Sequence, residues 1–315
     1  MLARWQSLLV ALALLAAGAW CVWCLQRGWG PGWLLAGLVL TLAPHAPVLA
    51  LEFVVLGLFG RDPGVPRATT VDLLRAWWGE VRVGWRVFGW RQPFAADREP
   101  DVPGVPGRTG VLLLHGYVCN RGLWVPWLRR LRRLGVPCTA LTLEPVFGGI
   151  DRYAPAIEAA VQDLTRRTGR PPLLVGHSMG GLAARAWLAS ARASAGGRSA
   201  DQRIAGVVTV GTPHQGSWAA RFGLSTNTRQ MRLGSAWLAA LAAREPAGRH
   251  ARFTCFFGHA DNLVFPARLA TLPGADNRHL AGVAHLQMVF DPAVLDAVLH
   301  RVRGCAAALT VGQVV

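Results

Sequence analysis

The chain contains no lysine: all 33 of its basic residues are arginine, against 17 acidic residues, which gives a formal net charge of +16. A surplus of this size ordinarily suggests a nucleic-acid partner. The sequence carries no RNA-binding motif with interleaved aromatics and no glycine-rich phosphate loop. Because every basic residue is of one type, we attribute the charge to compositional bias. We expect no nucleic-acid partner, and we expect arginine-bearing helix faces to meet water or anionic lipid.

Cysteine is scarce as well, with six residues among 315. No spacing of cysteine and histidine is typical of a zinc site, and no set of calcium ligands is visible. We therefore expect neither a metal nor a cofactor. The cysteines outside the apolar runs form no closely spaced framework, which is typical of a chain in a reducing compartment.

Two long apolar runs occupy residues 1–60, at 7–25 and 33–59. About 20 such residues span a bilayer core, so this region is expected to be a membrane-anchoring hairpin. Pro44 and Pro47 interrupt the second run and predict a kink or two re-entrant half-helices. One alternative is a signal peptide cleaved near Ala17-Gly18-Ala19, but the first run continues beyond that point to Leu25.

Arginines gather after the second run, whereas the connection between the runs carries only Arg27. We expect a location in the cell inner membrane, and the positive-inside rule then predicts that the remainder of the chain lies on the cytoplasmic side.

Residues 61–108 are expected to form a juxtamembrane helix and a linker. Apolar side chains recur there at steps of three and four residues, which predicts one apolar helix face. They are Leu74, Trp77, Trp78, Val81, Trp85 and Phe88. Such a face either lies among lipid headgroups or packs on the following domain, and the pattern leaves both interpretations open.

A serine between glycines, Gly176-His177-Ser178-Met179-Gly180, follows the apolar run 171–175 and precedes a helical stretch at 181–188. The glycines allow a sharp turn from strand to helix that exposes the serine hydroxyl. Upstream, a strand-length apolar run ends in His115-Gly116. Further apolar strands alternate with helical stretches across 109–304. This alternation predicts an α/β fold, a mostly parallel sheet with helices on both faces.

Taken together, these motifs resemble the α/β-hydrolase superfamily, in particular its bacterial lipase and esterase branch. Three further segments match that pattern, at 211–217, 258–266 and 282–286. The resemblance covers about 109–302 and implies the α/β-hydrolase fold with a helical cap, preceded here by the N-terminal membrane helices.

The resemblance implies a catalytic triad in which Ser178 is the nucleophile, His285 the general base and acid, and Asp261 the group that orients the imidazole. A serine hydroxyl needs an adjacent base to become a nucleophile at neutral pH, and imidazole suits that task. The backbone N–H groups of Tyr117 and Met179 are expected to form the oxyanion hole.

Other residues compete for the base and acid roles. His214, His259 and His279 are alternative bases, and His279 falls in what reads as a polar loop. Asp276 is the alternative acid, but no apolar strand directly precedes it, whereas residues 252–257 supply one for Asp261.

The segment 217–250 is long for a plain connection and rich in apolar residues, so we expect a cap with a helix at 236–244. Trp218, Phe222 and Trp237 are its expected substrate-binding residues, together with His115 at the strand end. We expect His115 to hydrogen-bond the oxyanion loop that follows it rather than to carry a proton. The cap's apolar residues equally suit a plain core.

The expected function is a membrane-associated serine hydrolase that cleaves lipid or other acyl esters through an acyl-enzyme, without a cofactor. An acyltransferase or thioesterase has the same site chemistry. A hydrolase-fold protein that only binds is the alternative of another class.

Overall fold

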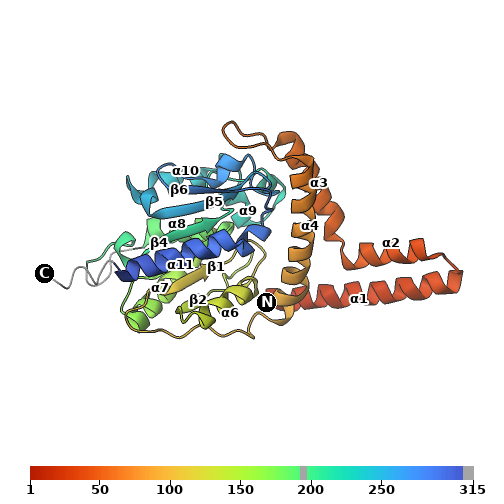
Figure 1. Cartoon of the computed structure of the whole chain (residues 1–315), viewed down its shortest axis with the longest axis horizontal. Coiled ribbons are helices and arrows are strands. Elements are labelled where there is room, and N and C mark those ends of the chain that lie inside the picture. The colour runs from red at the N-terminus through yellow and green to blue at the C-terminus, as the bar shows by residue number, and fades with distance from the viewer. Residues whose placement is uncertain (192–196, 308–315) are drawn as a thin grey trace.

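The structure is a computed structural model that describes residues 1–191 and 197–307, with side chains to residue 304. In this part of the chain six strands form one sheet in the order β2-β1-β3-β4-β5-β6, and every neighbouring pair is parallel (Figure 1). The expected α/β fold is confirmed. The strands are β1 Val111–Leu114, β2 Cys138–Ala140, β3 Leu173–His177, β4 Gly206–Val210, β5 Phe253–Gly258 and β6 Asp276–Leu280.

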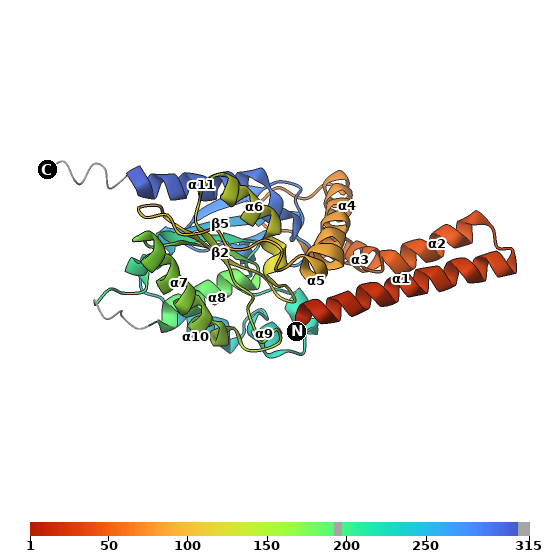
Figure 2. The ribbon, with the colours of Figure 1, turned by 90° about the horizontal axis from the view of Figure 1, so that it is seen from below.

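Helices cover both faces of the sheet, as Figure 2 shows, because the central strands are apolar on both sides. Helices α6 and α11 cover one face, and helices α7 and α8 cover the other. Their bounds are α6 Val125–Arg133, α7 Ala154–Thr168, α8 Met179–Ser190 and α11 Pro292–Ala307.

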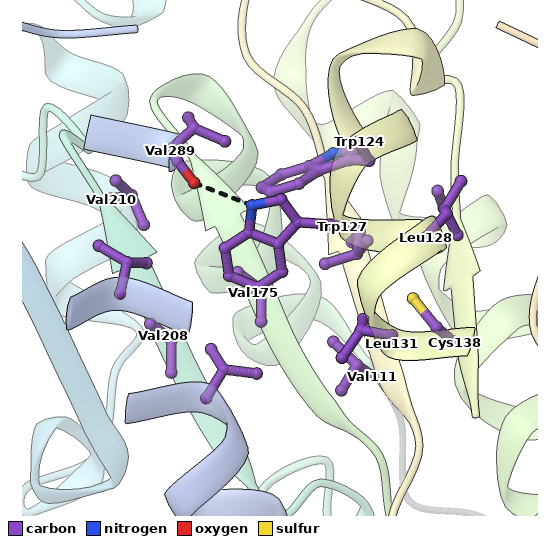
Figure 3. Close-up of a cluster of buried hydrophobic side chains, with 14 of the residues drawn as sticks. Val111, Trp124, Trp127, Leu128, Leu131, Cys138, Val175, Val208, Val210 and Val289 are labelled. Atoms are coloured by element: carbon purple, nitrogen blue, oxygen red, sulfur yellow. Dashed lines mark hydrogen bonds between the residues drawn. The ribbon is translucent and has the colours of Figure 1, made fainter. Parts of the chain in front are cut away.

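Trp127 of α6 links the core to the segment that follows His285. Its indole ring lies among the valines of β1, β3 and β4 (Figure 3). The indole N–H donates to the main-chain oxygen of Val289 at 2.8 Å. A buried tryptophan needs such an acceptor, so this bond fixes the short 3₁₀ helix Gln287–Phe290 against the sheet.

The prediction of a polar loop around His279 is wrong. Residues 276–280 form strand β6, at the edge of the sheet. It pairs with β5 from Thr254↔Asp276 to Gly258↔Leu280. Four of its five side chains are exposed. An edge strand that faces solvent lacks the apolar alternation from which strands are predicted.

The cap segment contains α9 Thr226–Gln230 and α10 Ala236–Ala243, so the helix expected at 236–244 is observed. Leu238 and Leu241 of α10 are buried and the helix packs beside α8. The second half of the segment is thus part of the helical layer.

Two helices project from the body of the protein, α1 Leu2–Arg27 and α2 Pro31–Leu42, and they lie side by side (Figures 1 and 2). By length and composition α1 is apolar enough to cross a membrane. Helix α2 meets α3 His45–Phe59 at a bend of 76°. The interruption predicted at Pro44 is confirmed as a break between two helices.

Helices α3 and α4 Thr70–Arg86 pack on the sheet domain. Phe53 and Leu56 of α3 are buried against Ala260, Phe265 and Ala284. The last part of the second apolar run is therefore a tertiary element of the domain as well as the continuation of the projecting hairpin.

Helix α4 begins with a capping box between Thr69 and Asp72. Ala76, Glu80 and Val81 on its inner side are buried, while Leu74, Trp78 and Trp85 are exposed, as is Phe88 in the π-helical turn Val87–Arg91 that follows. The inner side of α4 therefore packs on the domain, as one of the two interpretations predicts, and its outer side is exposed.

Candidate active site

Ser178 lies between the end of β3 and the start of α8, in the sharp turn that its flanking glycines predict. Its φ is 53° and its ψ is −124°, a strained backbone conformation for a residue with a side chain. A Cβ on Gly176 would lie 2.5 Å from the Gly181 nitrogen, and one on Gly180 would lie 2.3 Å from the Leu114 oxygen. Both contacts are with backbone, so only glycine allows this turn.

His285 and Asp261 form a buried pair at the same edge of the sheet. The imidazole Nδ1 lies 3.0 Å from each carboxylate oxygen of Asp261. One of these oxygens also accepts the backbone N–H groups of Leu263 and Val264, at 2.9 and 2.8 Å. The carboxylate is thereby fixed in the orientation that holds the imidazole.

The pKa of His285 is raised above its ordinary value. Burial of the ring acts to lower this pKa, but the negative charge of Asp261 and the hydrogen bond to it act in the opposite direction and outweigh burial. The pair therefore stabilises the imidazolium form.

The turn at Ser178 and the loop of His285 meet across the ends of β3 and β4. Ser178 N–H donates to the Val210 oxygen at 2.8 Å. A Cβ on the next residue, Gly211, would lie 3.1 Å from His285 Nδ1. His177 Nε2 lies 3.3 Å from the His285 main-chain oxygen. Among the described residues no hydrogen bond joins the Ser178 hydroxyl to the imidazole, and in unliganded sites such bonds are often long.

The backbone N–H groups of Tyr117 and Met179 have no acceptor within the described part of the chain. Met179 is the first residue of α8, so its N–H lies at the positive end of the helix dipole. Val118, next to Tyr117, has a φ of 52°, which is strained for a β-branched residue. A Cβ on Gly116, directly before Tyr117, would lie 3.1 Å from the Ser178 Cβ, so this segment runs beside Ser178.

A cavity of about 480 Å³ opens at Ser178. The cap contributes Trp218 and Phe222 to its walls, two of the residues expected there. The other walls come from Tyr117, from the Asn262–Phe265 loop and from α3. Its lining is predominantly apolar.

His115 and Trp237 do not line this cavity, which corrects the substrate-binding role expected for them. His115 Nδ1–H donates to the Gly116 oxygen at 2.8 Å, and its Nε2 accepts from the Leu143 N–H at 2.8 Å. Burial lowers the pKa of His115 to about 4, so the ring is neutral and supports the loop at Gly116 through its hydrogen bonds. Trp237, on α10, donates its indole N–H to the carboxylate of Asp151 at 2.7 Å.

The competing residues lie in other contacts. His214 is buried between Arg185 and Thr209. His259 and His279 bond each other at 3.0 Å near the exposed edge of the sheet. Asp276 forms an ion pair with Arg278 at 2.8 Å, also at that edge. None of these four residues lines the cavity that contains Ser178.

Two carboxylates to which the sequence assigned no site role reach the site from the N-terminal helices. Glu80 of α4 accepts the N–H groups of Leu286 and Gln287, directly after His285, at 2.8 and 3.0 Å. Glu52 of α3 accepts from the Asn262 amide at 2.6 Å. The available signal was an acidic residue within an otherwise apolar helix face.

A model of the alpha/beta hydrolase family matches residues 111–311. No curated protein matches the sequence significantly.

Among solved structures, the mature form of lipase BlEst2 from Bacillus licheniformis has a TM-score of 0.53 at 16% identity, over 63% of this chain and 95% of that chain. Lipase B from Aspergillus fumigatus has a TM-score of 0.52 at 15% identity, over 74% of this chain and 57% of that chain. At these identities the similarity shows the fold. The family model spans more than half of the sequence, and the chain therefore belongs to the alpha/beta hydrolase family.

Proposed function

We propose that the protein is a serine hydrolase that cleaves carboxylic esters through an acyl-enzyme. The observation that carries this proposal is the buried Asp261–His285 pair beside the strained Ser178, which opens into an apolar cavity. The solved structures of similar fold reported above are named lipases, which agrees with an ester as substrate.

In the first half-reaction His285 Nε2 accepts the Ser178 proton while the hydroxyl oxygen attacks the ester carbonyl carbon. The carbonyl oxygen becomes an oxyanion, held by the N–H groups of Tyr117 and Met179. One such donor contributes on the order of 2.7–4 kcal/mol to lowering the barrier. When the intermediate collapses, the imidazolium gives its proton to the departing alkoxide, and an acyl-serine remains.

In the second half-reaction His285 removes a proton from water, which attacks the acyl-serine. The carboxylic acid leaves and the proton returns to Ser178. Asp261 stabilises the imidazolium in both half-reactions, which is why the pKa of His285 is raised, and it holds the ring without being protonated itself.

A fluorophosphonate probe tests the nucleophile, because it reacts covalently with an activated serine. Full-length protein in detergent is compared with Ser178→Ala and with Ser190→Ala, a control at the far end of the same helix. Labelling lost only in Ser178→Ala, together with turnover of p-nitrophenyl esters, is expected. Equal labelling of all three proteins contradicts the proposal. No labelling of folded wild type favours a binding protein.

The same protein, supplied with an alcohol acceptor, distinguishes hydrolysis from acyl transfer. Free carboxylic acid as the main product supports the hydrolase. A product that shifts almost entirely to the acceptor ester identifies an acyltransferase, and turnover limited to thioesters identifies a thioesterase.

The proposal includes association with the inner membrane, with the catalytic domain on its cytoplasmic side. Helix α1 is almost wholly exposed along its apolar length, and the outer side of α4 adds exposed tryptophans beside arginines. Interfacial tryptophan and arginine are typical of a helix at the headgroup level.

The orientation is tested with a membrane-impermeant thiol reagent on intact cells. Gly30→Cys, at the turn between α1 and α2, is expected to react, whereas Arg61→Cys, between α3 and α4, is expected to react only after permeabilisation. The reverse pattern would invert the orientation, and release of the protein by alkaline carbonate would exclude the anchor.

A further inference from the structure

One wall of the cavity at Ser178 comes from outside the segment that the family model matches. Helix α3 contributes Val48, Leu51, Glu52 and Val55 to the lining, to which the cap also contributes. The family model begins at residue 111. The cavity therefore takes its shape from a helix that the common fold does not supply.

Helix α3 is held in a fixed position against the catalytic loops. Phe53 and Leu56 are buried against the residues that follow β5 and precede His285. Glu52 bonds Asn262, whose side-chain oxygen accepts the His285 N–H at 3.3 Å. The same helix thus shapes the cavity and contacts the loops of the catalytic pair.

The mouth of the cavity is apolar and open. Val48, Leu51 and Phe222 line it and are 58%, 65% and 68% exposed. Exposed apolar residues grouped at one site mark contact with another apolar surface. Helix α2, which joins α3 across a short break, continues this exposed apolar surface outward along the projecting hairpin (Figure 1).

The lining is also poor in charge. In the described part of the chain its one ionisable carboxylate is Glu52, already bonded to Asn262, and it contains no arginine. A phosphate group would find no cationic partner inside the cavity. An uncharged hydrocarbon chain is the occupant that these walls fit.

We propose that the space between α3 and the cap is the binding site for the fatty acyl chain of a membrane lipid ester, and that α3 sets the accepted chain length. The acyl chain passes from the apolar surroundings of the α1–α2 hairpin over Val48 and Leu51 into the cavity. This path places the ester carbonyl at Ser178. This inference rests on the proposed serine-esterase function and names its substrate class.

Val55→Trp tests the wall, and Val54→Trp is the matched control. Val55 lines the cavity, whereas its neighbour Val54 is exposed and lines a separate groove between α3 and α4. Full-length variants in detergent are assayed with p-nitrophenyl butyrate and p-nitrophenyl palmitate. We expect Val55→Trp to lower kcat/KM for palmitate at least tenfold relative to butyrate, and Val54→Trp to leave that ratio unchanged.

Labelling by a short alkyl fluorophosphonate shows whether each variant keeps its catalytic site. If Val55→Trp does not fold, Leu51→Trp at the exposed mouth takes its place with the same expectation. A chain-length ratio that stays unchanged in a labelled variant overturns the role of α3. Wild type that is neither labelled nor active overturns the proposed function instead, so the two failures are distinguishable.

The source of the acyl chain is tested with a long-chain fluorogenic diacylglycerol in phosphatidylcholine vesicles. Wild type is expected to hydrolyse this substrate, and Val55→Trp is expected to hydrolyse it at least tenfold more slowly. Activity confined to esters dissolved in micelles or water would overturn the assignment to a membrane lipid.

Discussion

Glu80 is a buried carboxylate of α4 that holds the loop of His285 from outside the sheet. Its two oxygens accept the N–H groups of Leu286 and Gln287 at 2.8 and 3.0 Å, one on each. In Glu80→Gln an amide –NH₂ replaces one of these oxygens and faces a backbone N–H. One donor of the loop then loses its acceptor while the helix and its volume stay the same.

The expected effect on catalysis is selective. A buried donor left without its acceptor costs about 1–3 kcal/mol. If the misplaced imidazole raises the activation free energy by about 1.4 kcal/mol, kcat falls about tenfold. KM is expected to stay unchanged because Glu80 does not line the cavity. Glu99→Gln, which weakens a surface ion pair with Arg129, is the control and is expected to leave kcat unchanged.

The same variant changes the pH dependence of stability. Burial raises the pKa of Glu80 from 4.5 to about 7 in the folded protein. Between these values the folded state binds a proton that the unfolded state has lost, so this group stabilises the protein fully below pH 4.5 and its contribution is lost as pH rises to about 7. At 1.36 kcal/mol per unit, the change is roughly 3 kcal/mol.

Urea unfolding of wild type and Glu80→Gln from pH 4.5 to pH 8 measures this change. The stability of the variant relative to wild type is expected to increase with pH across the window, whatever the offset between the two proteins. Parallel stability curves, together with an unchanged kcat, would refute the role assigned to Glu80.

Three further predictions concern the catalytic pair, the turn and the cap. Because Asp261 raises the pKa of His285, kcat/KM of the wild type should fall as the pH is lowered, with an apparent pKa above 6.5. Asp261→Asn should lower both that apparent pKa and kcat. Gly180→Ala should abolish fluorophosphonate labelling, since its Cβ would meet backbone. Glu245→Ala leaves buried Arg185 without its carboxylate partner and should lower the free energy of unfolding by about 3–5 kcal/mol, measured by urea titration.

The sequence was sufficient to predict the elements that carry their own signal. The strand before Ser178, the paired glycines and the helix after them are local, because steric limits act within a few residues. The same reasoning predicted the apolar strands and the break near Pro44, and the structure confirms both. The edge strand β6 was missed because its exposed polar side chains carry no apolar alternation.

The contributions of α3 and α4 to the site could not be predicted, since they depend on contacts between distant residues. Glu80 lies 206 positions before Leu286, and no local pattern records that separation. Phe53 and Leu56 belong to an apolar run that reads the same whether it meets lipid or protein. The hydrogen bond expected from His115 to the following loop is observed, at Gly116. The substrate-binding roles expected for His115 and Trp237 were wrong, because their partners Leu143 and Asp151 are set by tertiary packing.

The most direct test of the central claim is to trap the acyl-enzyme. The full-length protein is quenched in acid during turnover of a p-nitrophenyl ester, digested, and analysed by mass spectrometry. The account predicts an added acyl mass on the peptide that contains Ser178, and no such adduct in Ser178→Ala. Turnover by wild type with the acyl mass on another residue, or with none on this peptide, would contradict it.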